Sequence, residues 1–314
     1  MMNILNVLKK MKLLKKLKMN EKYIELIKEM HLGKCIMIDG ATGTELERRG
    51  VPQIPNAWNG GGALSHPEIL EEIHKEYIEL GARIIITNTF ATGKHTLKDA
   101  NQIHNFEKLN SQGVLIAKKA CKEVNKNSLI AGGISYWTFT KNKPSMEILR
   151  NNVKEQALIF KNYGVNLLIL EMMEDIERMM VTLEGAKNAN LPIWVGLSCK
   201  KDSSGKVVLL SGEPIEKAID NLNNKNVDLI NIMHTEIPLI NNCLDILQNK
   251  WKGLIGVYAH SGVMEKTKWT FEKLISPEDY SKYVHEWIER GINLVGGCCG
   301  ITTEHIKYIS EHNF

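Results

Sequence analysis

Residues 166–171 read NLLILE, so that four consecutive aliphatic side chains stand between an asparagine and a glutamate. A continuous apolar run of this kind, with no alternation of polar residues, is typical of a strand that is buried on both faces of a parallel sheet. The segment therefore predicts a fold of the α/β class rather than an antiparallel sheet with one face in water.

Seven further segments of the same kind lie on either side of it, at steady intervals. They are 35–39 (CIMID), 83–87 (RIIIT), 128–134 (SLIAGGI), 192–198 (PIWVGLS), 227–233 (VDLINIM), 253–258 (GLIGVY) and 292–296 (INLVG). The stretches between them carry helical periodicity, as in Ile69, Ile73, Tyr77 and Leu80. Eight strand–helix repeats predict a single-domain (β/α)8 TIM barrel. The alternative is an open doubly wound sheet, but no G-x-G-x-x-G follows the first strand to support a dinucleotide-binding version.

The chain has 314 residues, 43% hydrophobic and 24% charged, which are ordinary values for a globular protein. Its net charge of +4 is uneven: residues 1–32 hold eight Lys and three Glu, so the remainder is close to −1. The body therefore offers no basic surface for nucleic acid. We expect a basic amphipathic extension over 1–32 and the barrel over 33–314.

The extension has apolar residues at helical spacing, from Ile4 through Leu8 to Leu17, with lysines between them. Such a segment suits a membrane-surface anchor or a transit peptide. However, residues 1–30 contain neither the Arg nor the Ser of transit peptides. An accessory helix, or a true start at Met19, is the simpler interpretation.

Six cysteines are present, and no signal peptide or apolar run of about 18 residues accompanies them. We therefore predict a cytoplasmic protein without a membrane span, in which clustered cysteines bind metal or catalyse rather than form disulfides.

A barrel carries its active site at the C-terminal ends of its strands. Glu171 closes one strand there, either as the partner of a ligand cation or as a residue that reaches water. Cys298 and Cys299 follow the last strand between glycines, and His234 follows the sixth. Two thiolates and an imidazole are ligands that zinc favours, with the fourth position open in a catalytic site. The alternative is a pair of unrelated buried thiols.

These motifs resemble the homocysteine S-methyltransferases, a family that includes the betaine- and S-methylmethionine-dependent enzymes and the homocysteine module of cobalamin-dependent methionine synthase. The resemblance covers residues 35–309. It is carried by residues 39–46 (DGATGTEL), 87–90 (TNTF), Glu171 and 296–300 (GGCCG), with His66, His74, Tyr77 and His305 in family order.

The resemblance implies a zinc-dependent enzyme that methylates the thiol of homocysteine to give methionine, with no catalytic residue beyond the metal site. Glu171 and Asp39 would hold the amino group of homocysteine, the backbone of Gly40 and Ala41 its carboxylate, and Asn88 and Tyr77 would shape the pocket. S-methylmethionine or S-adenosylmethionine is the favoured donor. Betaine is an alternative, and methylcobalamin would need a partner protein. Oligomerisation is left open.

The chain also departs from the family pattern. The family's zinc is held by three cysteines, and His234 stands where the first is expected. Met172 replaces the Thr after the strand-four acid, and Ala259-His260 replaces a Pro-Asn pair. These departures leave two alternatives open: a divergent barrel that methylates another thiol or selenol, and a barrel that binds a metabolite or metal without catalysis.

Overall fold

Eight parallel strands form one sheet in the computed structural model, which describes residues 11, 20–265, 268–270 and 274–314. The strands are β1 (Ile36–Met37), β2 (Ile84–Ile86), β3 (Leu129–Ile134), β4 (Leu167–Met173), β5 (Ile193–Leu197), β8 (Leu229–Glu236), β9 (Leu254–His260) and β12 (Leu294–Val295). Their order is β1-β12-β9-β8-β5-β4-β3-β2, and a parallel bridge between Ile38 and Ile84 joins the two ends. The predicted barrel is confirmed, and an open doubly wound sheet is excluded.

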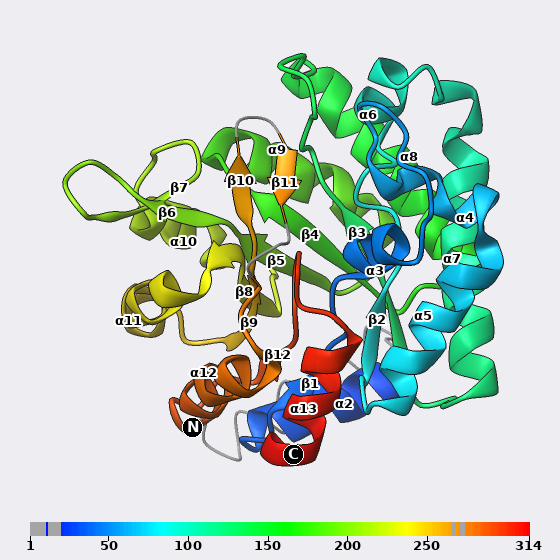
Figure 1. Cartoon of the computed structure of the whole chain (residues 1–314). Coiled ribbons are helices and arrows are strands. Elements are labelled where there is room, and N and C mark those ends of the chain that lie inside the picture. The colour runs from blue at the N-terminus through cyan, green and yellow to red at the C-terminus, as the bar shows by residue number, and fades with distance from the viewer. Residues whose placement is uncertain (1–10, 12–19, 266–267, 271–273) are drawn as a thin grey trace.

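Helices follow the strands and surround the sheet, as Figure 1 shows. The longer ones are α5 (Pro67–Glu79), α7 (Phe106–Glu123), α8 (Met146–Tyr163), α9 (Ile176–Ala186), α10 (Ile215–Leu222), α11 (Ile240–Lys250), α12 (Pro277–Glu289) and α13 (Thr303–Asn313). Short helices α3 (Thr42–Arg48), α4 (Gly62–Ser65) and α6 (Lys94–Asp99) lie in the loops after β1 and β2. In the described ranges, no helix combines the length and the apolar character needed to cross a membrane.

Strand side chains alternate between two apolar layers. In β4, Leu167 and Ile169 belong to the cluster inside the barrel, whereas Leu168 and Leu170 belong to the cluster between strands and helices. The two-residue period of a strand produces this division, and both faces are apolar because both are covered. This is the physical reason for the continuous apolar runs in the sequence.

Helix α2 (Glu21–His31) closes the barrel at the end where the strands begin. Its buried side chains share the interior cluster with the first residues of seven strands, including Leu129 and Leu229. The Tyr23 hydroxyl donates to Asp228 Oδ2 at 2.7 Å and accepts from Trp194 Nε1 at 3.1 Å. Residues 1–10 and 12–19, with most of the predicted basic stripe, lie outside the described residues. The division of the chain at residue 32 stays a prediction.

Two antiparallel hairpins extend the strand ends, and the sequence did not predict them. One pairs β6 (Cys199–Lys201) with β7 (Val207–Leu209), and the other pairs β10 (Val263–Glu265) with β11 (Lys268–Thr270). They follow β5 and β9, so they stand on the same side of the barrel as the predicted site (Figure 1).

Candidate metal centre

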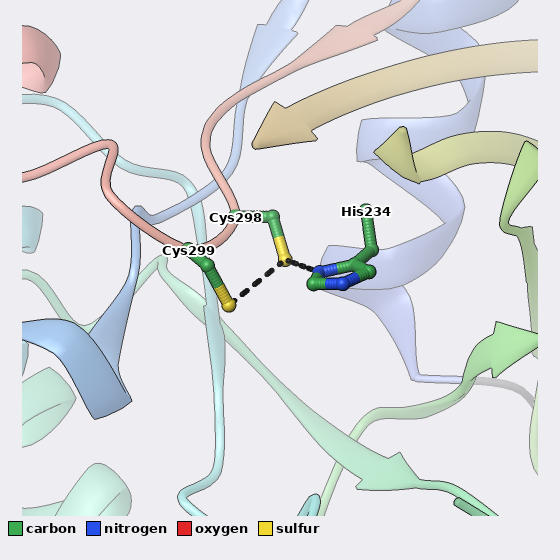
Figure 2. Close-up of side chains that lie close together, drawn as sticks. All are labelled: His234, Cys298 and Cys299. Atoms are coloured by element: carbon green, nitrogen blue, oxygen red, sulfur yellow. Dashed lines mark hydrogen bonds between the residues drawn. The ribbon is translucent and has the colours of Figure 1, made fainter. Parts of the chain in front are cut away.

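The structure brings His234, Cys298 and Cys299 together, although 64 residues separate the histidine from the first cysteine. One ligand atom from each lies within 4.8 Å of the others. Cys298 Sγ is 3.5 Å from His234 Nδ1 and 3.9 Å from Cys299 Sγ. Figure 2 shows both sulfur atoms and the imidazole on one side of the loop that follows β12. No other group of three such side chains suited to a metal occurs within the described ranges.

A tight turn presents the two thiols. The Ile301 N–H donates to the Cys298 carbonyl at 2.9 Å, and Gly300, the third residue of this turn, has φ 78°. A positive φ at that position is the requirement of a type II turn and favours glycine. A Cβ on Gly300 would lie 1.9 Å from the Ser261 carbonyl oxygen, so no larger residue fits. The glycine after the cysteine pair therefore fixes the direction of both sulfur atoms.

A β-bulge presents the histidine. The pairing of β8 with β9 shifts between Met233 and Glu236, so that β8 carries one extra residue there. Within the bulge His234 has φ 43°, in the left-handed region that a residue with a Cβ seldom adopts. This conformation turns the imidazole toward Cys298, which ordinary strand alternation would not do.

The three side chains fit a tetrahedral zinc ion. Zn–S bonds of about 2.3 Å and a Zn–N bond of about 2.0–2.1 Å would place the sulfurs about 3.8 Å apart and sulfur and nitrogen about 3.6 Å apart. The two separations from Cys298 Sγ, 3.9 and 3.5 Å, agree with these values, and the ligand atoms of Cys299 and His234 lie within 4.8 Å of each other. Contact with the Cys299 thiol, together with burial, holds the pKa of Cys298 well above its usual range. A bound cation would favour the anionic form of the Cys298 thiol.

Two carboxyl groups lie buried at the mouth of the barrel. Burial raises the pKa of Glu171 to about 8. A Cβ on Gly133 of β3 would lie 2.4 Å from Glu171 Oε2, so this glycine makes room for the carboxyl. Burial and, to a smaller extent, the charge of Glu171 raise the pKa of Asp39, whose Oδ2 accepts from the Ile86 N–H at 2.8 Å. The two predicted acids are thus close enough for the charge of Glu171 to affect the pKa of Asp39.

The other predicted substrate-binding residues surround the loop after β1. The Ala41 N–H donates to the Ile301 carbonyl at 2.9 Å, so this amide already has a hydrogen-bond partner within the protein. The buried Tyr77 ring packs against Gly40, where a Cβ would lie 2.8 Å from the phenol oxygen. Asn88 Nδ2 donates to the Asn59 carbonyl at 3.0 Å. These contacts position the loop, and the structure does not bring these side chains into the metal triangle.

An apolar cluster that the sequence did not reveal adjoins the thiols. Met172, Met233 and Tyr258 form its buried part, and the partly buried residues Phe90, Trp137, Leu210 and Cys298 pack against it. Its seven members come from seven separate loops or strands, which is why no local pattern identified it. Met172, at φ 57° in a bulge of β4, repeats the local conformation of His234.

A family model described as homocysteine S-methyltransferase matches residues 36–312. Homocysteine S-methyltransferase 1 of Arabidopsis thaliana is 25% identical over 91% of this chain and 95% of its own length. A selenocysteine methyltransferase of Astragalus bisulcatus is 26% identical, over 88% and 92%. Among solved structures, the metallated form of the homocysteine methyltransferase MmuM from Escherichia coli superposes with a TM-score of 0.73 at 20% identity, covering 89% of this chain and 96% of that one.

Proposed function

The chain belongs to the homocysteine S-methyltransferase family, the enzymes that transfer a methyl group to homocysteine, and on this premise we propose that it does so at a zinc ion held by His234, Cys298 and Cys299. The proposal includes a methyl donor with a positively charged sulfur or nitrogen, with S-methylmethionine or S-adenosylmethionine favoured. The observation that carries it is the cluster of one imidazole and two thiols, in which both separations from Cys298 Sγ suit a tetrahedral ion.

The reacting group is the thiol of homocysteine, which resembles a free cysteine with a pKa of about 8.5 and is mostly protonated at neutral pH. Zinc, when bound, supplies the charge that ionises a thiol at neutral pH. The thiol proton leaves to solvent. A new C–S bond forms as the bond between the methyl carbon and the onium atom breaks, and its electron pair leaves with the neutral sulfide or amine.

Glu171 and Asp39 would bind the ammonium group of homocysteine. Both carboxyls are buried and have raised pKa values, so an arriving cation would favour their ionised forms. This contact would orient the substrate so that its sulfur points toward the cysteine turn. Correct orientation of two reactants can lower a barrier by about 7–11 kcal/mol in favourable cases.

The apolar cluster beside Cys298 would receive the methyl donor. Phe90, Trp137 and Tyr258 supply aromatic rings, and Met172 and Met233 supply polarizable thioethers. Aromatic faces attract cations, by about 2 kcal/mol or more when water is excluded. The same surface would exclude water from the thiolate, which strengthens its electrostatic contacts.

The test measures bound zinc and methionine formation on the same protein. Purified protein is incubated with homocysteine and, in turn, S-methylmethionine, S-adenosylmethionine or betaine. We expect about one zinc per chain and methionine with an onium donor, and neither with Cys298→Ser. Bound zinc with no methionine from any donor would favour the alternative of a barrel that binds a metabolite or metal without catalysis.

A second candidate is methylation of a selenol by the same site. The selenocysteine methyltransferase among the relatives supports it, because that protein matches nearly the whole chain. A panel of thiols and selenols with one donor separates the two candidates. A location in the cytoplasm, with the cysteines reduced, stays a prediction, and the oligomeric state stays open.

A further inference from the structure

His260, the last residue of β9, lies directly against the candidate ligand His234. Their ring centroids are 4.5 Å apart and the ring planes are inclined by 45°. The His260 ring also hydrogen bonds to the backbone of His234. One side chain therefore contacts both the imidazole that would bind the metal and the peptide that carries it.

The backbone at His234 needs such support. A residue with a Cβ in the left-handed region costs of order 1–3 kcal/mol unless its surroundings enforce that conformation. Here the register shift leaves the extra residue of β8 outside the regular ladder, and Glu236 resumes the pairing opposite His260. His260 thus stands where the bulge ends, at the position best suited to hold it.

The surroundings of His260 also fix the ring. Its side chain is buried, with 9% of the residue exposed. A buried imidazole in ring contact with His234 has little room to move away from it.

We infer that His260 is a positioning residue for the metal centre, which holds His234 in the bulge so that its Nδ1 faces Cys298. The inference rests on the proposed function, because it requires His234 to be a ligand. It also gives the two departures from the family pattern, at 234 and 260, a common physical reason: a histidine ligand needs a partner ring that a cysteine ligand would not.

The test uses Co²⁺ as the probe, since its visible absorption reports the ligands and geometry of a site that zinc leaves colourless. The metal-free full chain is titrated with Co²⁺ against a competing chelator. Loss of an outer-shell partner of a metal-bound histidine typically costs about 10–100-fold in metal affinity. We expect a loss in this range for His260→Ala, with ligand-field bands altered and the thiolate-to-cobalt band retained.

His260→Phe keeps a ring against His234 but removes the hydrogen bond, so we expect an intermediate loss and an unaltered fold. His95→Ala is the matched control, because His95 is another buried histidine, whose ring bonds to the Trp137 carbonyl at 3.1 Å. It should lower thermal stability without changing Co²⁺ affinity. Wild-type affinity and spectrum in both His260 variants would overturn the inference.

A double-mutant cycle separates this inference from the proposed function. In a His234→Ala background, His260→Ala should cause no further loss of Co²⁺ affinity, because its effect acts through His234. An equal loss in that background would show that His260 acts on the site by another route, and the inference would fail. If His234→Ala alone binds Co²⁺ like the wild type, the proposed ligand set is wrong instead.

Discussion

At the residue scale, the identity of the third ligand sets the charge of the centre. Two thiolates and a neutral imidazole balance Zn²⁺, whereas three thiolates would leave a charge of −1. Less donation to the metal should hold a substrate sulfur more tightly and make it less nucleophilic. The histidine would therefore suit a more reactive onium donor better than a less reactive one.

His234→Cys tests this relation. With a fixed onium donor we expect kcat to rise and KM for homocysteine to rise with it, each by up to about tenfold, which corresponds to about 1.4 kcal/mol. Steady-state kinetics and zinc analysis on the same preparations provide the measurement. The ligand role of His234 is contradicted if kcat, KM and zinc affinity all match those of the wild type.

Glu171 should make the stability of the free protein depend on pH. Its pKa of about 8 in the folded state exceeds the 4.5 of an unperturbed Glu, so the folded state binds more protons between these values. Stability should therefore fall as pH rises from about 4.5 to 8 and then level off. Glu171→Gln should remove this slope and gain a few kcal/mol above pH 8, at about 1.4 kcal/mol per pKa unit. Urea denaturation across this pH range checks it, and an unchanged slope would contradict it.

The chemistry of the site was predictable from single residues, but its geometry was not. Cys298, Cys299 and His234 were recognisable because their residue types and strand-end positions suit zinc, and the structure places them together. The contribution of His260 and of the apolar cluster depends on contacts between strands that are distant in sequence. The hydrogen bond from the Ala41 N–H likewise depends on the carbonyl of Ile301, which lies 260 positions away in the chain. No local pattern encodes such pairings.

At the element scale, the barrel interior relies on glycines that make room for polar side chains. A Cβ on Gly256 of β9 would lie 2.0 Å from Asn231 Oδ1 of β8. Asn231 is fully buried, and neither amide atom has a hydrogen-bond partner among the described residues. The two strands therefore tolerate either a side chain at 256 or an asparagine at 231, but not both.

Gly256→Ala should accordingly destabilise the fold by about 1–3 kcal/mol, the usual cost of overpacking a core. Adding Asn231→Ala should restore most of that loss, because it removes both the clash and an unsatisfied buried amide. Urea denaturation of the two single variants and the double variant gives the coupling energy. Additive effects would show that the two positions do not meet as described.

The barrel strands could be predicted from the sequence, whereas the hairpins and the bulges could not. Each of the eight apolar runs became a barrel strand, because burial on both faces leaves a signal in every residue of the run. The β6–β7 and β10–β11 hairpins were missed, because β6 (CKK), β10 (VME) and β11 (KWT) contain charged residues and are not part of a continuous apolar run. The bulges at Met172 and His234 were missed as well, because a shift of register leaves the hydrophobic pattern of the strand nearly intact.

At the scale of the whole molecule, the metal centre and the core are separate. Of the proposed ligands, Cys298 and Cys299 lie beyond the end of β12 and His234 lies near the end of β8, whereas the two large apolar clusters fill the barrel and the layer around it. Chelation should therefore abolish methionine formation and lower the melting temperature by only several degrees, with one cooperative transition retained. Circular dichroism during heating, with and without chelator, is the measurement. Global unfolding on metal removal would mean that the ion is structural.

The opposite end of the barrel should be sensitive to a single oxygen atom. Tyr23→Phe removes the hydrogen bond to the Asp228 carboxylate and the acceptor of the Trp194 indole. A bond to a charged group is worth about 1.5–3 kcal/mol, so we expect a loss of that order. Activity at saturating substrate should not change, because the proposed methyl-transfer site lies at the other end. A fall in kcat without a fall in stability would contradict this separation.

Helix α2 also has a consequence for how the protein is made. Asp228 lies 205 residues after Tyr23, so the ribosome finishes the helix long before this partner emerges. At about 5–20 residues per second, the apolar face of α2 stays incompletely covered on the nascent chain for roughly 10–40 seconds. The end of the barrel that α2 covers is therefore closed late in synthesis. During that interval we expect α2 to be a binding target for chaperones.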